Sequence, residues 1–227
     1  MKLLLTSGGV TNPSIQGALV DLLGKPIDQC HALCIPTAAY GHPMGSPQTT
    51  WRFISGRGQS PMTQLGWQSV GVLELTALPS MDRNRWEKWV RETDALLVDG
   101  GDALYLCHWL RESGLAGLLP DLDDLVWVGL SAGSMVATPR IGEEFVTTNP
   151  PITGDDRTLG LVDFSIFPHL DHPGFAGNTM AGAEKWAANL GTHSYAIDDQ
   201  TAIKVEGREV EGVSEGNCRY FALSSEA

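Results

Sequence analysis

One stretch of the sequence has residue types and spacing that suit covalent catalysis. Residues 125–137 contain a run of apolar residues, then Gly129-x-Ser131-x-Gly133, then small residues suited to a helix. A serine between a strand and a helix in this pattern indicates a nucleophile elbow, a strained turn that lifts the hydroxyl above the end of a strand. The two glycines leave room for the turn and for an approaching substrate. The pattern therefore predicts that Ser131 is a nucleophile.

The same stretch has simpler interpretations. A tight turn with a helix-capping serine would show the same pattern, and Ser134 provides a second hydroxyl nearby. Ser134, however, falls within the first turn of the predicted helix, where hydroxyls usually serve packing or local hydrogen bonds. The N–H of Ala132 begins that helix and could point at an oxyanion, which the helix dipole also favours. These considerations favour Ser131.

A serine nucleophile needs a base near neutral pH, and histidine is the usual one. The chain has six histidines: His31, His42, His108, His169, His172 and His193. His31 opens a predicted strand and His108 lies in a predicted helix, so both are expected to be structural. His42 lies in a long loop and remains a candidate. His169 follows a strand and a proline, at a strand end where catalytic residues gather, and is the favoured base.

The residues around the favoured base leave two questions open. His169, Asp171 and His172 could suggest a metal site, but no further Cys or His cluster accompanies them, so we expect no metal. The carboxylate that orients the base should come from another strand end, and Asp198 and Asp199 lie between apolar strands. Adjacent aspartates are usually a surface turn, and composition alone does not choose between the two interpretations.

Strands separated by helices indicate the architecture that positions these residues. Strands are expected at residues 2–6, 31–35, 70–75, 95–98 and 125–130, and helices between Asn12 and Gly24, at about 46–55, at 82–93 and from 102 to about 113. This order predicts an α/β fold with a mostly parallel sheet and helices on both faces. Ligands of such sheets bind beyond the carboxyl ends of the strands, where Gly100, Gly101 and Ser131 lie.

The remaining segments are shorter or less regular. Residues 164–167 read as a strand, about 176–190 as a helix, and the chain from 194 as short strands with turns at 206–208 and 215–217. Residues 37–66 are rich in Gly, Pro, Ser and Thr. A loop this long within one domain is more often functional than idle.

Length and composition limit the classes of protein. The chain has 227 residues, of which 42% are hydrophobic, and residues 1–227 are expected to form one α/β domain. A net charge of −12 argues against nucleic acid or an anionic membrane as partner. No run of eighteen apolar residues appears, so no transmembrane helix is expected. The apolar run at the start of the sequence is too short for the hydrophobic region of a signal peptide. Four cysteines without metal-binding spacing are expected to be free and mostly buried, which favours a cytoplasmic location.

Four motifs together resemble a known family. They are Val98-Asp99-Gly100-Gly101-Asp102, Gly129-Leu130-Ser131-Ala132-Gly133, Pro168-His169 and Ile197-Asp198-Asp199-Gln200-Thr201-Ala202. In this order the chain resembles the peptidase E (S51) family of serine peptidases, which includes aspartyl dipeptidases and, more distantly, cyanophycinases. The resemblance covers nearly the whole chain. It implies the class I glutamine-amidotransferase-like fold, a flavodoxin-like three-layer sandwich.

The resemblance assigns roles to individual residues. It implies that Ser131 is the nucleophile, His169 the general base and Asp199 the acidic member of a catalytic triad. It also implies that the N–H groups of Gly101 and Ala132 form the oxyanion hole. The expected reaction is acyl transfer on small peptides, with no cofactor.

Two departures from the family bear on the substrate. Asp102, which with Gly100 is expected beside the substrate, stands where the dipeptidases have Asn. The dipeptidases also hold the acidic side chain of the substrate with an arginine on the helix after the histidine. Residues 174–190 contain no arginine and only Lys185. An acidic site without a bidentate cation is a poor host for a second carboxylate, which counts against Asp-X specificity.

Two other functions stay open at this point. An α/β-hydrolase esterase would use Ser131 with Asp163 and His193, in the chain order Ser, Asp, His. A binding module that kept the fold without catalysis is the second alternative, since fold does not prove activity. A glutamine amidotransferase is disfavoured because those enzymes have cysteine at the elbow. A homodimer is left open, because relatives often pair but no interface is legible in the sequence.

Overall fold

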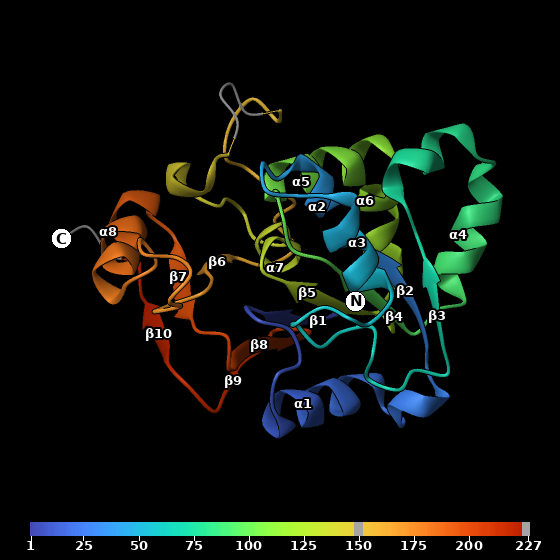
Figure 1. Ribbon diagram of the computed structural model, residues 1–227, viewed down its shortest axis with the longest axis horizontal. Helices are drawn as coiled ribbons and strands as arrows, with labels where there is room; N and C mark the ends of the chain where they lie inside the picture. Colours follow the sequence, from blue (N-terminus) through green and yellow to red (C-terminus); the bar gives the residue numbers. More distant parts are fainter. Residues whose placement is uncertain (148–151, 224–227) are drawn as a thin grey trace.

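A seven-stranded sheet forms the centre of the computed structural model, which describes residues 1–147 and 152–223 (Figure 1). Its strand order is β3-β2-β4-β5-β1-β8-β9. The strands are β1 Lys2–Thr6, β2 His31–Ile35, β3 Ser69–Val72, β4 Ala95–Val98, β5 Val126–Leu130, β8 Thr201–Glu206 and β9 Glu209–Ser214. The first five run parallel, and β8 and β9 pair antiparallel at one edge. This is the predicted mostly parallel sheet.

Helices cover both faces of this sheet. They are α1 Pro13–Leu23, α2 Ala38–Gly41, α3 Pro47–Ile54, α4 Arg83–Arg91, α5 Ala103–Glu112, α6 Leu115–Leu118 and α7 Ala132–Met135, with short 3₁₀ turns at Ile27–Gln29, Leu75–Ser80, Leu119–Asp121 and Glu143–Phe145. A further helix, α8 Met180–Leu190, packs on a second sheet. Figure 1 shows α1 on one side of the sheet and α5 and α6 on the other. No helix of the described residues is long and apolar enough to cross a membrane.

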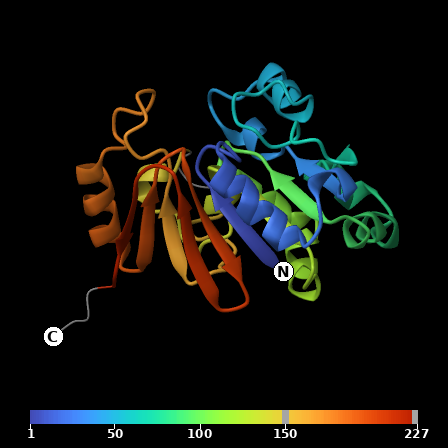
Figure 2. The same ribbon diagram turned by 90° about the horizontal axis from the view of Figure 1, so that it is seen from below.

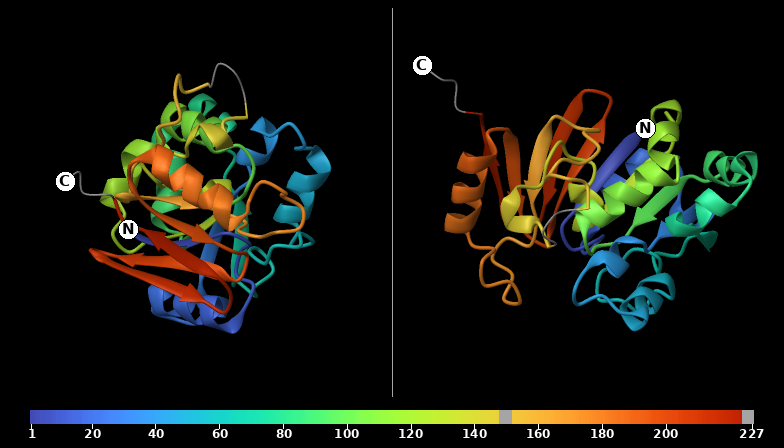
Figure 3. Two further views of the ribbon diagram at one scale, coloured as in Figure 1. Left: turned by 90° about the vertical axis from the view of Figure 1, so that its left-hand side faces the viewer. Right: turned by 90° about the horizontal axis from the view of Figure 1, so that it is seen from above.

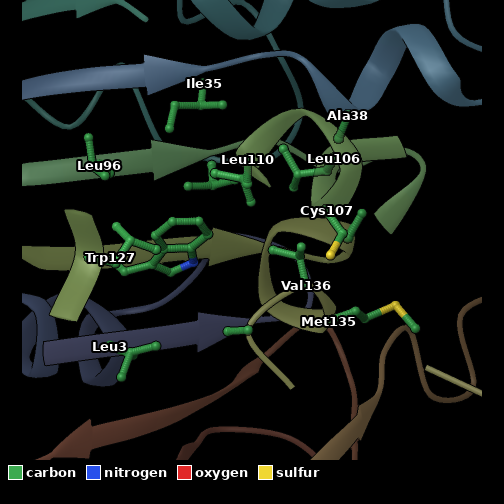
Figure 4. Close-up of a cluster of buried hydrophobic side chains, with 14 of the residues drawn as sticks. Leu3, Ile35, Ala38, Leu96, Leu106, Cys107, Leu110, Trp127, Met135 and Val136 are labelled. Atoms are coloured by element: carbon green, nitrogen blue, oxygen red, sulfur yellow. The ribbon is translucent and has the colours of Figure 1, made fainter. Parts of the chain in front are cut away.

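Each face of the sheet builds its own apolar core because side chains alternate along a strand. Leu3 and Leu5 pack toward α5, whereas Leu4 packs toward α1. Figure 4 shows part of the first core, where Leu3, Leu96 and Trp127 of the strands meet side chains from α5 and α7. Burial on both faces explains why these strands read as continuous apolar runs.

A second sheet lies beside the first (Figures 2 and 3). It has the order β10-β7-β6 and consists of β6 Phe164–Phe167, β7 His193–Ile197 and β10 Cys218–Phe221. Helix α8 packs on it through Trp186, whose ring meets Phe167 edge to face. Phe164, Ile166 and Ile197 belong to the same buried cluster as the main sheet, so the two sheets share a core.

Most predicted elements are confirmed, and the differences have local causes. Helix α1 has Asn12 as its N-cap and Gly24, with φ 67°, as its C-cap. Strand β3 ends at Val72 rather than residue 75, because Leu75 begins a 3₁₀ turn instead. Helix α8 begins only at Met180, where Thr179 caps it. The separate second sheet was not predicted, since it depends on pairing between distant segments.

Candidate active site

The predicted elbow adopts a strained backbone. Ser131 follows β5 and precedes α7, and it has φ 50° and ψ −108°, a region that side-chain-bearing residues rarely occupy. A Cβ on Gly129 would lie 2.5 Å from the Gly133 carbonyl oxygen, and one on Gly133 would lie 2.2 Å from that of Val98. The glycines therefore permit the tight approach that the turn requires.

His169 lies beside this serine. It follows β6 and Pro168, and its Nε2 is 2.9 Å from the Ser131 Oγ. Its Nδ1 is 2.7 Å from Oδ1 of Asp199, so a continuous chain of hydrogen bonds joins serine, imidazole and carboxylate. Like Ser131, His169 has a positive φ, 56°. Geometry of this kind suits nucleophilic catalysis through a general base.

The two aspartates between β7 and β8 have different surroundings. Asp198 accepts hydrogen bonds from Thr201 Oγ1 at 2.7 Å and from the Asn217 N–H, which makes it part of a turn. Asp199 instead faces His169. It also lies close against Gly8, because a Cβ built on Gly8 would be 2.7 Å from the Cβ of Asp199. These contacts distinguish the two aspartates, which the sequence left open.

A serine that the sequence reasoning missed completes this network. Ser7, fully buried at the end of β1, donates a hydrogen bond to Asp199 Oδ1 at 2.7 Å. The same hydroxyl accepts one from the His169 backbone N–H at 2.7 Å. The available signal was the position of Ser7, directly before two glycines at the carboxyl end of the first strand.

Charges and rings around His169 favour an ionised Asp199. Burial raises the pKa of Asp199, but hydrogen bonds from His169 and Ser7 and the charges of His169 and His172 outweigh it, so the net pKa is lowered. His172 Nε2 lies 3.7 Å from Asp199 Oδ2. The ring of Phe175 stacks on His169 with centroids 4.9 Å apart. The carboxylate can therefore hold the imidazole and stabilise its protonated form.

Two backbone N–H groups in the elbow and in the loop beside it have no acceptor among the described residues. The loop after β4 lies against the elbow, since a Cβ on Gly100 would be 3.5 Å from the Ser131 Cβ. Within the described residues, neither the Gly101 N–H nor the Ala132 N–H donates a hydrogen bond to the protein. Gly101 has φ 141°, and a Cβ there would strike the Ala38 carbonyl at 2.3 Å.

A cavity of about 750 Å³ opens beside the elbow. The loop after β4 contributes Asp99, Gly100 and Gly101 to its wall, and β5 contributes Leu130. Much of the rest comes from the 37–66 segment, namely Ala39, His42, Met44, Gly45, Thr49, Arg52, Phe53, Arg57, Gly58, Gln59 and Ser60. The long loop singled out in the sequence therefore forms most of the wall of the cavity next to Ser131.

The acidic group in this cavity is not the one expected. Asp102 caps α5, with Oδ1 accepting from the Tyr105 N–H at 2.7 Å, and its other oxygen accepts from Thr147. Its side chain is 4% exposed and does not line the cavity, whereas Asp99 does. Helix α8 indeed lacks arginine, but Arg52 and Arg57 reach the cavity from α3 and the loop after it.

The geometry also excludes the alternative nucleophile, Ser134, and the alternative base, His193. Ser134 is fully buried and its hydroxyl donates to the Thr6 carbonyl at 2.7 Å, so it is structural. His193 begins β7, at the end opposite to His169, and binds the Tyr220 hydroxyl at 2.7 Å. The Ser131 and His193 pair of the esterase alternative is therefore contradicted.

A serine elbow over a parallel sheet, with an imidazole and a carboxylate in hydrogen-bonding range, defines the class of α/β serine hydrolases. Within that class the chain belongs to peptidase family S51, whose sequence profile matches residues 3–213. It is a serine-type peptidase, and membership of this family implies peptide substrates.

Named relatives agree with this assignment. Proteins called Peptidase E from Shewanella baltica strains OS155 and OS185 and from Shewanella putrefaciens strain CN-32 are 29%, 30% and 30% identical to this chain. Each alignment covers 64% of this chain and 67% of the relative.

Two crystal structures share the fold. An assigned peptidase E protein from Listeria monocytogenes EGD-e matches with a TM-score of 0.70 and 21% identity, covering 95% of this chain and 98% of its own. A peptidase from an acI-B1 Actinobacterium matches with a TM-score of 0.68 and 19% identity, covering 99% and 95%. The predicted class I glutamine-amidotransferase-like fold is confirmed.

Proposed function

We propose that Ser131, His169 and Asp199 are the catalytic triad of this peptidase and that it hydrolyses small peptides through an acyl-enzyme. The observation that carries the proposal is the 2.9 Å approach of His169 Nε2 to the Ser131 Oγ. The strained φ of Ser131 supports it, because strain of this kind persists at functional sites that hold it in place.

The reaction follows from this geometry. Nε2 of His169 takes the hydroxyl proton as Ser131 Oγ bonds to the peptide carbonyl carbon. Asp199 accepts the Nδ1–H bond, fixes the tautomer and stabilises the imidazolium. The imidazolium then gives its proton to the departing amine, and water, deprotonated by the same nitrogen, releases the acyl group from Ser131.

The negative oxygen of the tetrahedral intermediate needs donors. We assign this role to the N–H groups of Gly101, in the loop beside the elbow, and Ala132, in the elbow, which have no acceptor among the described residues. The Ala132 N–H begins α7 directly after Ser131. Loss of one such donor typically costs about 10²–10³ in rate.

The cavity argues against a preference for Asp-X peptides. Asp99, a buried carboxyl, lines it beside Gly100, and a second carboxylate there would be repelled. Arg52 and Arg57 also line the cavity, but both are exposed side chains whose charges water screens. Aspartyl dipeptides are therefore expected to be turned over no better than dipeptides with neutral first residues.

A labelling experiment tests the triad. A fluorophosphonate probe is expected to modify Ser131, located by peptide mass spectrometry, and labelling should be lost in Ser131→Ala and strongly slowed in His169→Ala. Ser80→Ala, which removes an exposed hydroxyl far along the chain, is the matched control and should label normally.

Turnover of a dipeptide library completes the test. Hydrolysis by wild type but not by Ser131→Ala supports the proposal. Labelling of another residue, or equal turnover by Ser131→Ala, would refute the assignment of the nucleophile, and the absence of both labelling and turnover in folded protein would favour a silent binding module.

A further inference from the structure

Asp99 is a buried carboxyl without a cationic partner. It follows β4, is 9% exposed, and its Oδ1 accepts the Gly100 N–H at 2.8 Å. Comparable buried acids are compensated: Asp156 forms two hydrogen bonds to Arg140, at 2.9 and 3.0 Å, and Asp102 caps a helix. Buried charges in proteins are normally paired, so the isolation of Asp99 calls for a physical reason.

The position of Asp99 in the cavity gives a physical reason for its lack of a cationic partner. Its side chain lines the cavity beside Ser131, next to Gly100 and Gly101 in the loop to which we assign an oxyanion donor. A Cβ on Gly100 would lie 3.5 Å from the Ser131 Cβ, so a peptide carbonyl bound at Ser131 comes close to this loop. The α-nitrogen of the residue that supplies that carbonyl is only two bonds away from it. This places the substrate nitrogen near the loop that carries Asp99 and makes Asp99 a candidate partner for it.

The groups that face Asp99 do not neutralise it. Burial raises its pKa to about 7, and the hydrogen bond from Gly100 opposes this only in part. Among the described residues no basic side chain forms an ion pair with it; Arg52 and Arg57 are exposed, and the latter stacks on Trp51. His42 also lines the cavity.

The remaining titratable neighbour is a thiol. Cys34 lies on β2, the strand beside β4, and burial together with Asp99 raises its pKa to about 12. It therefore stays neutral at physiological pH and offers no positive charge. Neither His42 nor the two arginines that line the same cavity forms an ion pair with Asp99, so this position is open to a cationic group of the ligand.

We propose that Asp99 is a specificity-determining residue that binds a cationic nitrogen of the substrate, either its free α-ammonium or a basic side chain. A charge-assisted hydrogen bond to a buried carboxylate is stronger than a neutral one, and it would remove the cost of the isolated charge. The proposal rests on Ser131 as the nucleophile and names the chemistry that the cavity selects.

The experiment compares matched pairs of coumarin amides in wild type and Asp99→Asn. Leucine amide against N-acetyl-leucine amide reports on the α-ammonium, and N-acetyl-lysine amide against N-acetyl-leucine amide reports on a basic side chain. We expect Asp99→Asn to lower the kcat/KM ratio of one cationic substrate to its neutral partner by about tenfold or more. The pair that responds identifies the source of the cation.

Asp124→Asn is the control, since it removes one negative charge from an exposed side chain outside the cavity. It should leave both ratios unchanged. Ratios that stay constant in Asp99→Asn, with the variant folded by circular dichroism, would overturn the proposal. An equal loss on all substrates would do the same, because it would indicate a purely structural role.

A binding measurement separates this proposal from the catalytic one. Calorimetry with Ser131→Ala protein compares leucinamide and lysinamide with their N-acetyl forms, and needs no turnover. Tighter binding of a cationic ligand that is lost when Asp99→Asn is added supports the proposal even if no peptide is cleaved. Equal binding of charged and neutral ligands overturns it even if Ser131 proves to be the nucleophile.

The pH dependence gives a third readout. Between pH 5.5 and 7.5 the ratio of charged to neutral substrate should rise in wild type as Asp99 ionises, and should stay flat in Asp99→Asn. Any pH effect on the shared catalytic step cancels in this ratio because it affects both substrates alike. A ratio in wild type that does not change with pH contradicts the proposal.

Discussion

At the scale of single residues, Ser7 determines how well the imidazole and its carboxylate are held. Its hydroxyl binds both Asp199 Oδ1 and the backbone N–H of His169 at 2.7 Å, deep in the protein. One small side chain thus fixes two members of the hydrogen-bonded chain relative to each other. It can act only through them, because it does not touch Ser131 in the described contacts.

Ser7→Ala is therefore expected to lower kcat about tenfold with little change in KM. It leaves the His169 backbone N–H without its acceptor and removes one of the two hydrogen bonds to Asp199 Oδ1, a loss of roughly 1–2 kcal/mol. The matched control is Thr11→Val, which loses a 2.7 Å bond to the Asp199 backbone but not to its carboxylate. Steady-state kinetics check this, and an equal fall of kcat in the two variants would count against a specific role for Ser7.

Asp99 makes stability depend on pH in a predictable direction. Its folded pKa of about 7 exceeds the ordinary value of 3.8, so the folded state binds the proton more tightly than the unfolded state does. Stability from this group is full below about pH 4 and falls as the pH rises to 7. This pKa shift corresponds to a change in the free energy of unfolding of at most roughly 4 kcal/mol.

Asp99→Asn removes this penalty while keeping an acceptor for Gly100. We expect its free energy of unfolding relative to wild type to be higher at pH 8 than at pH 5, by about 1–4 kcal/mol. Urea unfolding at the two pH values measures it, with Asp124→Asn as the reference for net charge. A difference that does not change with pH would show that Asp99 is not buried as a charge.

At the scale of elements, the loop between β1 and α1 positions the acid. Gly8 of this loop allows Asp199 to approach, and Thr11 and Asn12 hold the Asp199–Gln200 backbone through hydrogen bonds of 2.7 and 2.9 Å. The first loop of the chain therefore fixes a turn almost two hundred residues later.

Gly8→Ala should displace that turn, since the new Cβ would lie 2.7 Å from the Cβ of Asp199. We expect at least a tenfold loss of kcat in a protein that remains folded, because imidazole orientation is worth orders of magnitude in such triads. Gly17→Ala on α1 is the control, as its Cβ meets nothing within 4 Å and should stabilise the helix by about 0.5–1 kcal/mol. Steady-state kinetics of both variants measure kcat, and thermal unfolding measures their stability. An unchanged kcat in Gly8→Ala would contradict the prediction.

The sequence predicts those elements whose signals are local. The glycines around Ser131 and the caps of α1 act within a few residues, so pattern alone finds them. Asp199 could not be separated from Asp198 in that way, because the distinction depends on Asn217 and His169, which are distant in the chain. Resemblance to a family, rather than physics, made that assignment.

Long-range contacts also explain what the sequence did not reveal. The second sheet arises from pairing of β10 with β7, and the cavity from a loop that folds back over the end of the main sheet. Asp102 was expected beside the substrate because the resemblance places it where the dipeptidases have Asn. Its side chain instead caps α5, and Asp99 lines the cavity.

At the scale of the whole molecule, the site lies where the two sheets meet. Ser131 and Asp99 follow strands of the main sheet, His169 follows β6 of the second, and Asp199 lies on the connection between them. The distance from Ser131 to His169 therefore depends on how firmly the second sheet is held. The packing of the second sheet against α8, mainly through Trp186, helps to hold that sheet in place.

Trp186 tests this dependence. It is fully buried, its Nε1 donates to the Ile141 carbonyl at 2.8 Å, and its ring packs against Phe167 at the end of β6. Trp186→Ala should cost about 3–5 kcal/mol in unfolding free energy, and the urea concentration at which activity is half lost should fall with it.

Trp89→Ala is the matched control, because this tryptophan on α4 is 38% exposed and lies far along the chain from the second sheet. Its removal should cost well under half as much, roughly 1 kcal/mol, because a half-exposed ring loses less burial. Circular dichroism and residual peptidase activity, followed over the same urea series, report on fold and site together. Activity that persists in Trp186→Ala up to the midpoint of the wild type would mean that the position of His169 does not depend on the packing of α8 against the second sheet.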